Sequence, residues 1–232
     1  MQRLDKIISS QTIYSRKEIK DLIRSKRVMV NGEVISKADL KVDSSKDEIK
    51  IDGNVITIKQ YVYLMLNKPK GYISATEDKS MPTVLDLVPE EYRHRDIFPA
   101  GRLDKDTTGL MLITDDGAFA HDILSPKKHV KKTYIVTVDI PITMEMVKGF
   151  EDGVLLNDGE CKSALLEIIG TYIGRVTLTE GRYHQIKRMF ACFGATVIEL
   201  QRISMGNFYL PDNLPLGCCR EFTNEELKKI QE

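Results

Sequence analysis

Residues 101–117 read GRLDKDTTGLMLITDDG, a polar loop that runs directly into an apolar stretch. The loop begins and ends near glycines, and its charged residues are Arg102, Asp104, Lys105 and Asp106. The apolar residues 110–113 have the length of a short buried strand, and Asp-Asp-Gly then predicts a turn before a helix over 118–124. The pattern therefore places four charged side chains directly before a buried strand.

Two roles for this loop require no catalysis. Asp104 can accept hydrogen bonds from nearby backbone N–H groups in a polar turn. Asp104 and Asp106 can also hold a divalent cation, although two carboxylates without further oxygen ligands rarely suffice. The four histidines are scattered along the chain, so the sequence predicts no metal site.

Strands outnumber helices on both sides of the loop. Apolar or alternating runs predict strands over 62–66, 133–140, 161–169, 174–181 and 195–203. Helical spacing is confined to 84–88, 118–124, 144–150 and 183–194, the last closed by Gly194. Because the strands come in runs rather than in βαβ units, we expect an α+β domain with a mixed, largely antiparallel sheet flanked by helices over residues 60–232.

Residues 1–59 predict a separate, smaller α+β module. Two short helices are expected, and Ser15 with Glu18 forms a capping box that starts the second one near Arg16. Two hairpins follow, because Asn-Gly in VMVNGEVI and Asp-Gly in EIKIDGNVITI interrupt alternating apolar residues.

The charge is unevenly distributed although the whole chain is neutral. Residues 1–59 carry 13 Lys and Arg against 9 Asp and Glu, which leaves 21 against 25 for the remainder. The excess is concentrated in the second helix and its end, where a solvated polar face is the simplest explanation. The basic residues are Arg16, Lys17, Lys20, Arg24, Lys26 and Arg27.

Composition excludes several classes of protein. A chain of 232 residues with 42% hydrophobic and 29% charged residues is globular, and it has no apolar run long enough to cross a bilayer. The start MQRLDK does not resemble a secretory signal, and four cysteines without a disulfide or metal spacing indicate a reduced, cytoplasmic protein. Phosphate-binding glycine loops, a nucleophile elbow and H-E-x-x-H are absent, so nucleotide hydrolase, serine esterase and zinc peptidase chemistry have no support.

The N-terminal module resembles the S4 RNA-binding domain. The resemblance spans residues 1–59 and depends on Ser-Arg at the start of the second helix, then Leu-Ile, then V-x-V-N-G. It implies that cations on a rigid helix contact RNA phosphates, with affinity gained by counterion release. The contacts implied are those of Arg3, Arg16, Lys17, Lys20, Arg24 and Arg27.

The rest of the chain resembles the pseudouridine synthases of the RsuA type. The 101–117 stretch matches the signature loop of that family, and three further motifs follow the family's order: MLNKPKGY before it, then KKTYIVTV and EGRYHQIKRMF after it. EGRYHQIKRMF is closer to members that act on small-subunit ribosomal RNA than to those that act on the large subunit.

The resemblance implies isomerisation of a uridine within RNA to pseudouridine. The N1–C1′ bond breaks, the uracil turns in its pocket, and C5 bonds to C1′, so neither cofactor nor metal is required. Asp104 falls on the family's essential carboxylate, Lys187 on the basic residue that keeps it ionised, and Tyr134 on the tyrosine that stacks on the base. Whether Asp104 attacks C1′, adds to the ring or removes the 2′ proton is left open. Without the resemblance, Lys187 reads as an exposed helix cation and Tyr134 as a core residue.

Further basic residues are implied as RNA contacts. Arg102 can fill the space that a flipped base vacates, and Arg182 can hold the RNA backbone. Arg188, one residue after Lys187 and turned about 100° around a helix, points to phosphate instead. Lys131 and Lys132 beside Tyr134 are expected to meet a neighbouring phosphate.

The sequence thus predicts a monomeric enzyme that modifies 16S rRNA, free or in a small-subunit assembly intermediate, and that does not associate with membranes. The same chemistry on 23S rRNA is the nearest alternative. A non-catalytic RNA-binding assembly factor is another, but it does not require Asp104, Tyr134 and Lys187 together. A glycosidase lacks a suitably placed second carboxylate.

Overall fold

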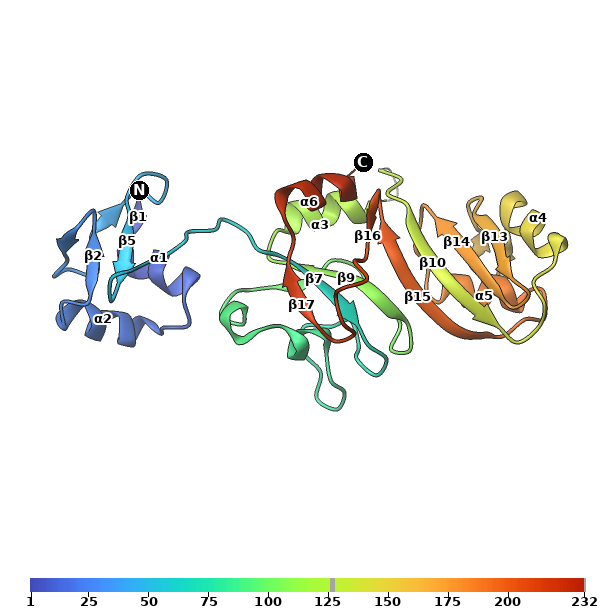
Figure 1. Cartoon of the computed structure of the whole chain (residues 1–232), viewed down its shortest axis with the longest axis horizontal. Coiled ribbons are helices and arrows are strands. Elements are labelled where there is room, and N and C mark those ends of the chain that lie inside the picture. The colour runs from blue at the N-terminus through green and yellow to red at the C-terminus, as the bar shows by residue number, and fades with distance from the viewer. Residues whose placement is uncertain (126–127, 232) are drawn as a thin grey trace. The chain divides into compact units, whose positions relative to one another are not determined.

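The computed structural model describes residues 1–125 and 128–231, which form two compact units. The N-terminal unit comprises Met1–Val62 together with Val88–Ile97, and the C-terminal unit comprises Tyr63–Leu87 and the residues from Phe98 onward. Figure 1 shows the small helical and sheet structure of the first and the long twisted sheet of the second. The predicted domain boundary after residue 59 stays a prediction, and the inclusion of Val88–Ile97 in the N-terminal unit was not foreseen.

The N-terminal unit begins with two helices, α1 (Leu4–Gln11) and α2 (Arg16–Arg24). The predicted capping box is confirmed: Ser15 Oγ accepts from the Glu18 N–H at 3.3 Å, and Glu18 Oε2 accepts from the Ser15 N–H at 2.7 Å. The apolar faces of both helices pack on the strands around Leu4, Ile8 and Ile19, none of which is exposed. The charged face of α2 therefore points to solvent.

Two hairpins make the small sheet, as predicted. Asn31-Gly32 and Asp52-Gly53 all have positive φ values, between 51° and 83°, which the tight hairpin turn requires. The strand order is β3-β2-β5-β6, and a separate pair joins β1 to β4. The bounds are β1 Gln2–Arg3, β2 Val28–Val30, β3 Glu33–Val34, β4 Lys41–Val42, β5 Ile49–Ile51 and β6 Asn54–Val55.

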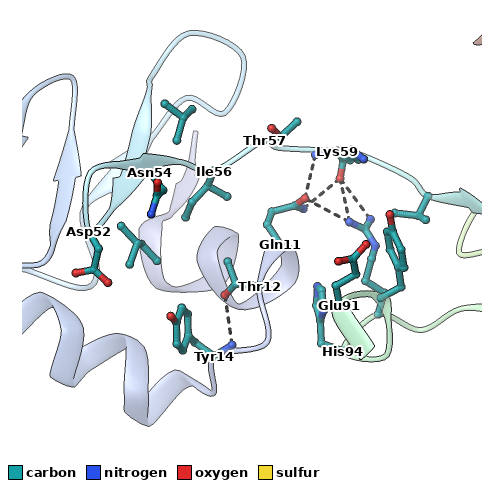
Figure 2. Close-up of a pocket in the computed structure, with 15 residues that line it drawn as sticks. Gln11, Thr12, Tyr14, Asp52, Asn54, Ile56, Thr57, Lys59, Glu91 and His94 are labelled. Atoms are coloured by element: carbon teal, nitrogen blue, oxygen red, sulfur yellow. Dashed lines mark hydrogen bonds between the residues drawn. The ribbon is translucent and has the colours of Figure 1, made fainter. Parts of the chain in front are cut away.

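The segment Val88–Ile97 packs on this unit through a hydrogen-bonded junction that includes the short helix η2 (Glu90–Tyr92). Arg95 donates to the carbonyl oxygens of Lys59 at 3.3 Å and Gln60 at 2.9 Å, and His94 Nε2 lies 3.1 Å from the Ser10 carbonyl oxygen. Figure 2 shows Gln11, Lys59, Glu91 and His94 along the pocket beside this junction.

One nine-stranded sheet forms the C-terminal unit, with strand order β13-β14-β10-β15-β9-β7-β17 and with β8 and β16 beside it. Every pairing is antiparallel except that of β9 with β15, so the predicted mixed, largely antiparallel sheet is confirmed. The bounds are β7 Tyr63–Lys68, β8 Phe98–Pro99, β9 Thr108–Thr114, β10 Lys132–Val138, β13 Leu165–Gly170, β14 Ile173–Leu178, β15 Val197–Met205, β16 Phe208–Tyr209 and β17 Cys219–Glu221.

Two hydrophobic cores cover the two halves of this sheet. Helices α4 (Met144–Asp152) and α5 (Gln185–Ala191) pack against the half made by β10, β13, β14 and β15, while α3 (Gly117–Leu124) and α6 (Asn224–Gln231) pack against the half that contains β7 and β9. The parallel pair β9–β15 joins the halves. The remaining elements are η1 Val84–Leu87, β11 Leu155–Leu156 and β12 Gly159–Glu160.

Two predicted helices differ in detail from the structure. The segment expected as a helix over 84–88 is a single 3-10 turn, η1. The helix expected over 183–194 begins only at Gln185, because His184 adopts a left-handed backbone conformation with φ 48°. That break turns the chain sharply just before α5.

Candidate active site

A buried lysine holds the loop between β8 and β9 in place. Lys68, at the end of β7, is completely buried, and its ammonium group donates to the carbonyl oxygens of Asp104 at 3.0 Å and Thr107 at 2.8 Å. Its contacts with the carbonyl oxygens of Pro69 and Lys105 are 3.2 and 3.3 Å. Burial lowers the pKa of Lys68 to about 8, against the attraction of Asp106 and Asp104. Four carbonyl dipoles therefore hold one cation, and the cation holds the loop.

Two further contacts set the course of the loop. Ser74 Oγ donates to the Leu103 carbonyl oxygen and accepts from the Leu103 N–H, at 2.8 and 2.9 Å. Gly109, with φ 100°, lies so close to β15 that a Cβ atom there would be 2.2 Å from the Arg202 carbonyl oxygen. The glycine that ends the loop thus permits the parallel contact of β9 with β15.

Asp104 contacts two basic side chains from the start of α5. Lys187 Nζ lies 3.2 Å from Asp104 Oδ2, and His184 Nε2 lies 3.4 Å from Asp104 Oδ1. Lys187 Nζ also lies 2.6 Å from Asp106 Oδ1. Burial tends to raise the pKa of Asp106, but its hydrogen bond and charge interaction with Lys187 leave that pKa below its usual value. Lys187 shows the reverse balance: burial is outweighed by the two carboxylates, and its pKa is raised.

His184 was not singled out from the sequence. It precedes Lys187 by three positions, so a helical continuation places both on one face, and this spacing was the available signal. The rings of His184 and Tyr183 stack at a centroid distance of 3.9 Å. Tyr183 is largely exposed, so this pair forms part of the rim of the site.

A cavity of about 380 Å³ opens beside Asp104. It brings together several residues predicted from different motifs, because the loop after β8, strands β10 and β15, and the chain before α5 all contribute to its wall. The polar residues that line it include Arg102, Asp104, Lys132, Tyr134, Arg182, His184 and Arg202. Tyr134 is partly buried in this wall, whereas Arg102 is exposed. The cavity therefore has a carboxylate, an aromatic ring and several cations around one space.

Two of the predicted RNA contacts are already bound to protein groups. Arg182 donates to the carbonyl oxygens of Gly159 and Glu160. Arg188 forms an ion pair with Asp158, and both its side chain and that of Arg182 are only about a quarter exposed. These two arginines thus connect the β11–β12 hairpin to the start of α5.

Lys131 and Lys132 lie in different surroundings. Lys131 is exposed, but Lys132 is buried, with its ammonium group 3.0 Å from the Val130 carbonyl oxygen. Burial lowers the pKa of Lys132 to about 8, with a further contribution from the charge of Arg202. Lys132 is thus a cavity residue rather than a surface cation.

In the N-terminal unit, the predicted RNA-binding cations fall into two groups. Arg16, Lys17 and Lys20 are exposed on α2. Three arginines instead form ion pairs with nearby carboxylates: Arg3 with Asp5, Arg24 with Asp21 and Arg27 with Asp52. The first group is the one with charge available to a partner.

Neither a metal site nor a membrane span is found in the described part of the chain. Within residues 1–125 and 128–231, no three His, Cys, Asp or Glu side chains are grouped as metal ligands. Over the same residues, no helix has the length and apolar character needed to cross a bilayer.

Comparison with known proteins agrees with this geometry. Residues 62–192 match the family model described as RNA pseudouridylate synthase, and residues 2–49 match the S4 domain. Ribosomal small subunit pseudouridine synthase A of Yersinia pestis is 43% identical over 98% of this chain and 97% of its own length. The uncharacterized RNA pseudouridine synthase YtzG of Bacillus subtilis (strain 168) is 42% identical over 99% and 98%. A crystal structure of a pseudouridylate synthase matches with a TM-score of 0.70 at 37% identity, covering 99% of this chain and all of that one. The chain therefore belongs to the RNA pseudouridine synthase family and carries an S4 domain at its N-terminus.

Proposed function

We propose that this enzyme converts one uridine of 16S ribosomal RNA to pseudouridine, with Asp104 as the essential carboxylate. The observation that carries the proposal is the position of Asp104: its carboxylate lines the cavity and contacts Lys187 at 3.2 Å. The choice of small-subunit RNA follows from relatives such as the Yersinia pestis enzyme, whose name assigns it to the small ribosomal subunit.

The chemistry needs an ionised carboxylate beside the sugar of the target nucleotide. Asp104 is about one quarter exposed, so it is partly desolvated but open to the cavity. Lys187 Nζ lies 3.2 Å from one carboxylate oxygen of Asp104, and His184 contacts the other oxygen. Because isomerisation neither adds nor removes atoms, the reaction proceeds without a cofactor.

The target base must leave its stack to reach Asp104, at a cost of a few kcal/mol. Tyr134 offers an aromatic face in the cavity wall on which the extracted uracil stacks. Arg102, exposed on the same loop as Asp104, fills the vacated position in the RNA. The exposed cations of α2 dock a neighbouring RNA element.

The test uses 16S rRNA labelled with tritium at uridine C5, because the new C5–C1′ bond expels that hydrogen to water. We expect release by the unaltered protein and none by Asp104→Asn, with RNA binding retained. Asp106→Asn is the matched control: it removes the other carboxylate that contacts Lys187, but Asp106 does not line the cavity, so most of the activity is expected to remain.

Two alternatives are separated by the same assay. Tritium release from 23S rRNA and not from 16S rRNA would show that the target uridine lies in large-subunit RNA. Tight binding of either RNA without any release would identify an assembly factor and overturn the enzymatic proposal. Mapping pseudouridine in rRNA from cells that lack the gene then identifies the target nucleotide, in free RNA or in assembly intermediates.

A further inference from the structure

Arg202 is a buried cation, and no carboxylate among residues 1–125 and 128–231 forms an ion pair with it. It is 2% exposed on β15, and its Nε donates to the Leu110 carbonyl oxygen at 2.7 Å. Its Nη2 atom is buried and has no hydrogen-bond partner among the described residues. A buried, incompletely paired guanidinium group is costly, so its presence in a cavity wall calls for a ligand that satisfies it.

Lys132 lies in the same wall and adds a second buried charge. It is 7% exposed, and it forms no ion pair within the part of the chain that the structure describes. Lys132 and Tyr134 are two residues apart on β10, and Tyr134 is the cross-strand partner of Arg202 on β15. Side chains two apart on a strand and side chains of paired residues share a face of the sheet. All three line the cavity next to Asp104.

We propose that Arg202, assisted by Lys132, binds the carbonyl edge of the target uracil and stabilises the negative charge that the base acquires when it leaves the sugar. This inference rests on the proposed function. A base stacked on Tyr134 lies on the sheet face that carries both cations. The exposed Arg102 is placed to fill the position that the base leaves in the RNA, whereas the depth of Arg202 suits the base itself.

The charge balance of the reaction supports this assignment. When the N1–C1′ bond breaks, its electron pair stays with the uracil, and the negative charge spreads over N1 and the two carbonyl oxygens. The charge disappears when C5 bonds to C1′, C5 loses its proton and N1 gains one. A preformed cation in a dry site favours the detached base and the transition state that leads to it.

The same two cations affect the free enzyme. Burial, together with the charge of Arg202, lowers the pKa of Lys132 to about 8, so its protonated form is disfavoured in the cavity wall. An anionic base between the two cations removes that penalty. The unfavourable free energy of burying the two cations is therefore offset when the N1–C1′ bond breaks.

The experiment measures the single-turnover rate at saturating RNA with two leaving bases, uracil and 5-fluorouracil. Arg202→Gln is expected to lower the single-turnover rate on uridine-containing 16S rRNA about 100-fold, with RNA affinity nearly unchanged. Arg202→Lys restores at least part of the rate. In RNA containing 5-fluorouridine, the electron-withdrawing fluorine stabilises the detached base, so the defect of Arg202→Gln, measured as disappearance of the intact nucleoside, shrinks at least tenfold.

Two further variants show whether the defect of Arg202→Gln comes from a loss of folding rather than from a loss of charge. Lys132→Met keeps the length of the side chain and is expected to show a smaller defect with the same dependence on fluorine. Arg220→Gln removes a guanidinium group that pairs with Glu226 away from the cavity and is expected to leave both rates unchanged.

The outcomes separate the two proposals. Equal defects on both RNAs in Arg202→Gln and Lys132→Met, or a loss of affinity with normal chemistry at saturation, would overturn the charge-stabilising role while the enzyme stays active. Inactivity of the unaltered protein on ribosomal RNA would overturn the proposed function and this inference with it.

Discussion

The ammonium group of Lys187 lies 3.2 Å from Asp104 Oδ2 and bridges this carboxylate to Asp106. Both Lys187 and Asp104 are about one quarter exposed, so their attraction is stronger than that of a pair in open water. Lys187 thus links the loop before β9 to the first turn of α5, beside the contact of His184 with Asp104.

Replacement of Lys187 tests whether this cation acts on the reaction rather than on RNA affinity. Lys187→Met is expected to reduce the turnover rate about 100-fold with little change in RNA affinity, because the carboxylate loses its fixed counterion. Lys187→Arg is expected to recover part of the rate. Arg188→Gln is the comparison, since its side chain pairs with Asp158 rather than with Asp104; it is expected to lower the turnover rate much less than Lys187→Met does. A turnover rate that falls as far in Arg188→Gln as in Lys187→Met would contradict the role of Lys187.

Lys68 provides a separate prediction about the loop itself. Lys68→Met leaves the carbonyl oxygens of Asp104 and Thr107 without their donor in a buried position, so it is expected to cost about 1–3 kcal/mol of unfolding free energy and to abolish activity. Urea unfolding followed by circular dichroism measures the first effect and tritium release the second.

The control for Lys68 is its neighbour Lys70, which is half exposed and contacts Glu199 at 3.3 Å. Lys70→Met is expected to change stability by less than about 1 kcal/mol. A Lys68→Met protein as stable and active as the unaltered one would show that the four carbonyl contacts do not hold the loop.

The local signals in the sequence predicted much of this fold. The hairpins at Asn31-Gly32 and Asp52-Gly53 and the capping box at Ser15 depend on two to four neighbouring residues, so a single sequence is enough to recognise them. The strands of the large sheet were also visible, because their apolar residues alternate or run together. Their order in the sheet was not predicted, since it depends on contacts between distant segments.

The features that were missed depend on tertiary surroundings. Lys68 and Arg202 look like ordinary cations in the sequence, and only the fold shows that both are buried. His184 breaks the expected helix because its backbone is left-handed, a conformation that spacing alone does not indicate for a residue other than glycine. The packing of Val88–Ile97 on the N-terminal unit likewise follows from long-range hydrogen bonds of Arg95.

The lowered pKa of Lys132 predicts how stability changes with pH. In the unfolded chain this ammonium group has its ordinary pKa of 10.5, whereas in the folded protein the value is about 8. Between these values the unfolded chain binds more protons, so the contribution of Lys132 to the unfolding free energy rises with pH, by at most about 1.4 kcal/mol per pH unit.

The measurement is urea unfolding of the unaltered protein and of Lys132→Met at pH 7.5 and pH 9.5. We expect the stability of the unaltered protein to increase relative to the variant at the higher pH, and taking the difference cancels other groups such as Cys219, whose pKa is raised by burial to about 12. Lys131→Met is the control, because that side chain is exposed. A difference independent of pH would show that Lys132 is not desolvated.

The salt dependence of RNA binding tests the basic face of α2. Replacement of its exposed cations Arg16, Lys17 and Lys20 by glutamine is expected to weaken RNA binding and to reduce the slope of log affinity against log salt by about 2–3, because three phosphate contacts no longer release counterions. The matched control replaces the arginines that already pair with carboxylates, Arg3, Arg24 and Arg27, and is expected to change the slope less. Turnover at saturating RNA should stay near normal in both triple variants, since Asp104 and its cavity lie in the other unit. An unchanged slope in the first variant would remove α2 from the RNA interface and leave binding to the cations around the cavity.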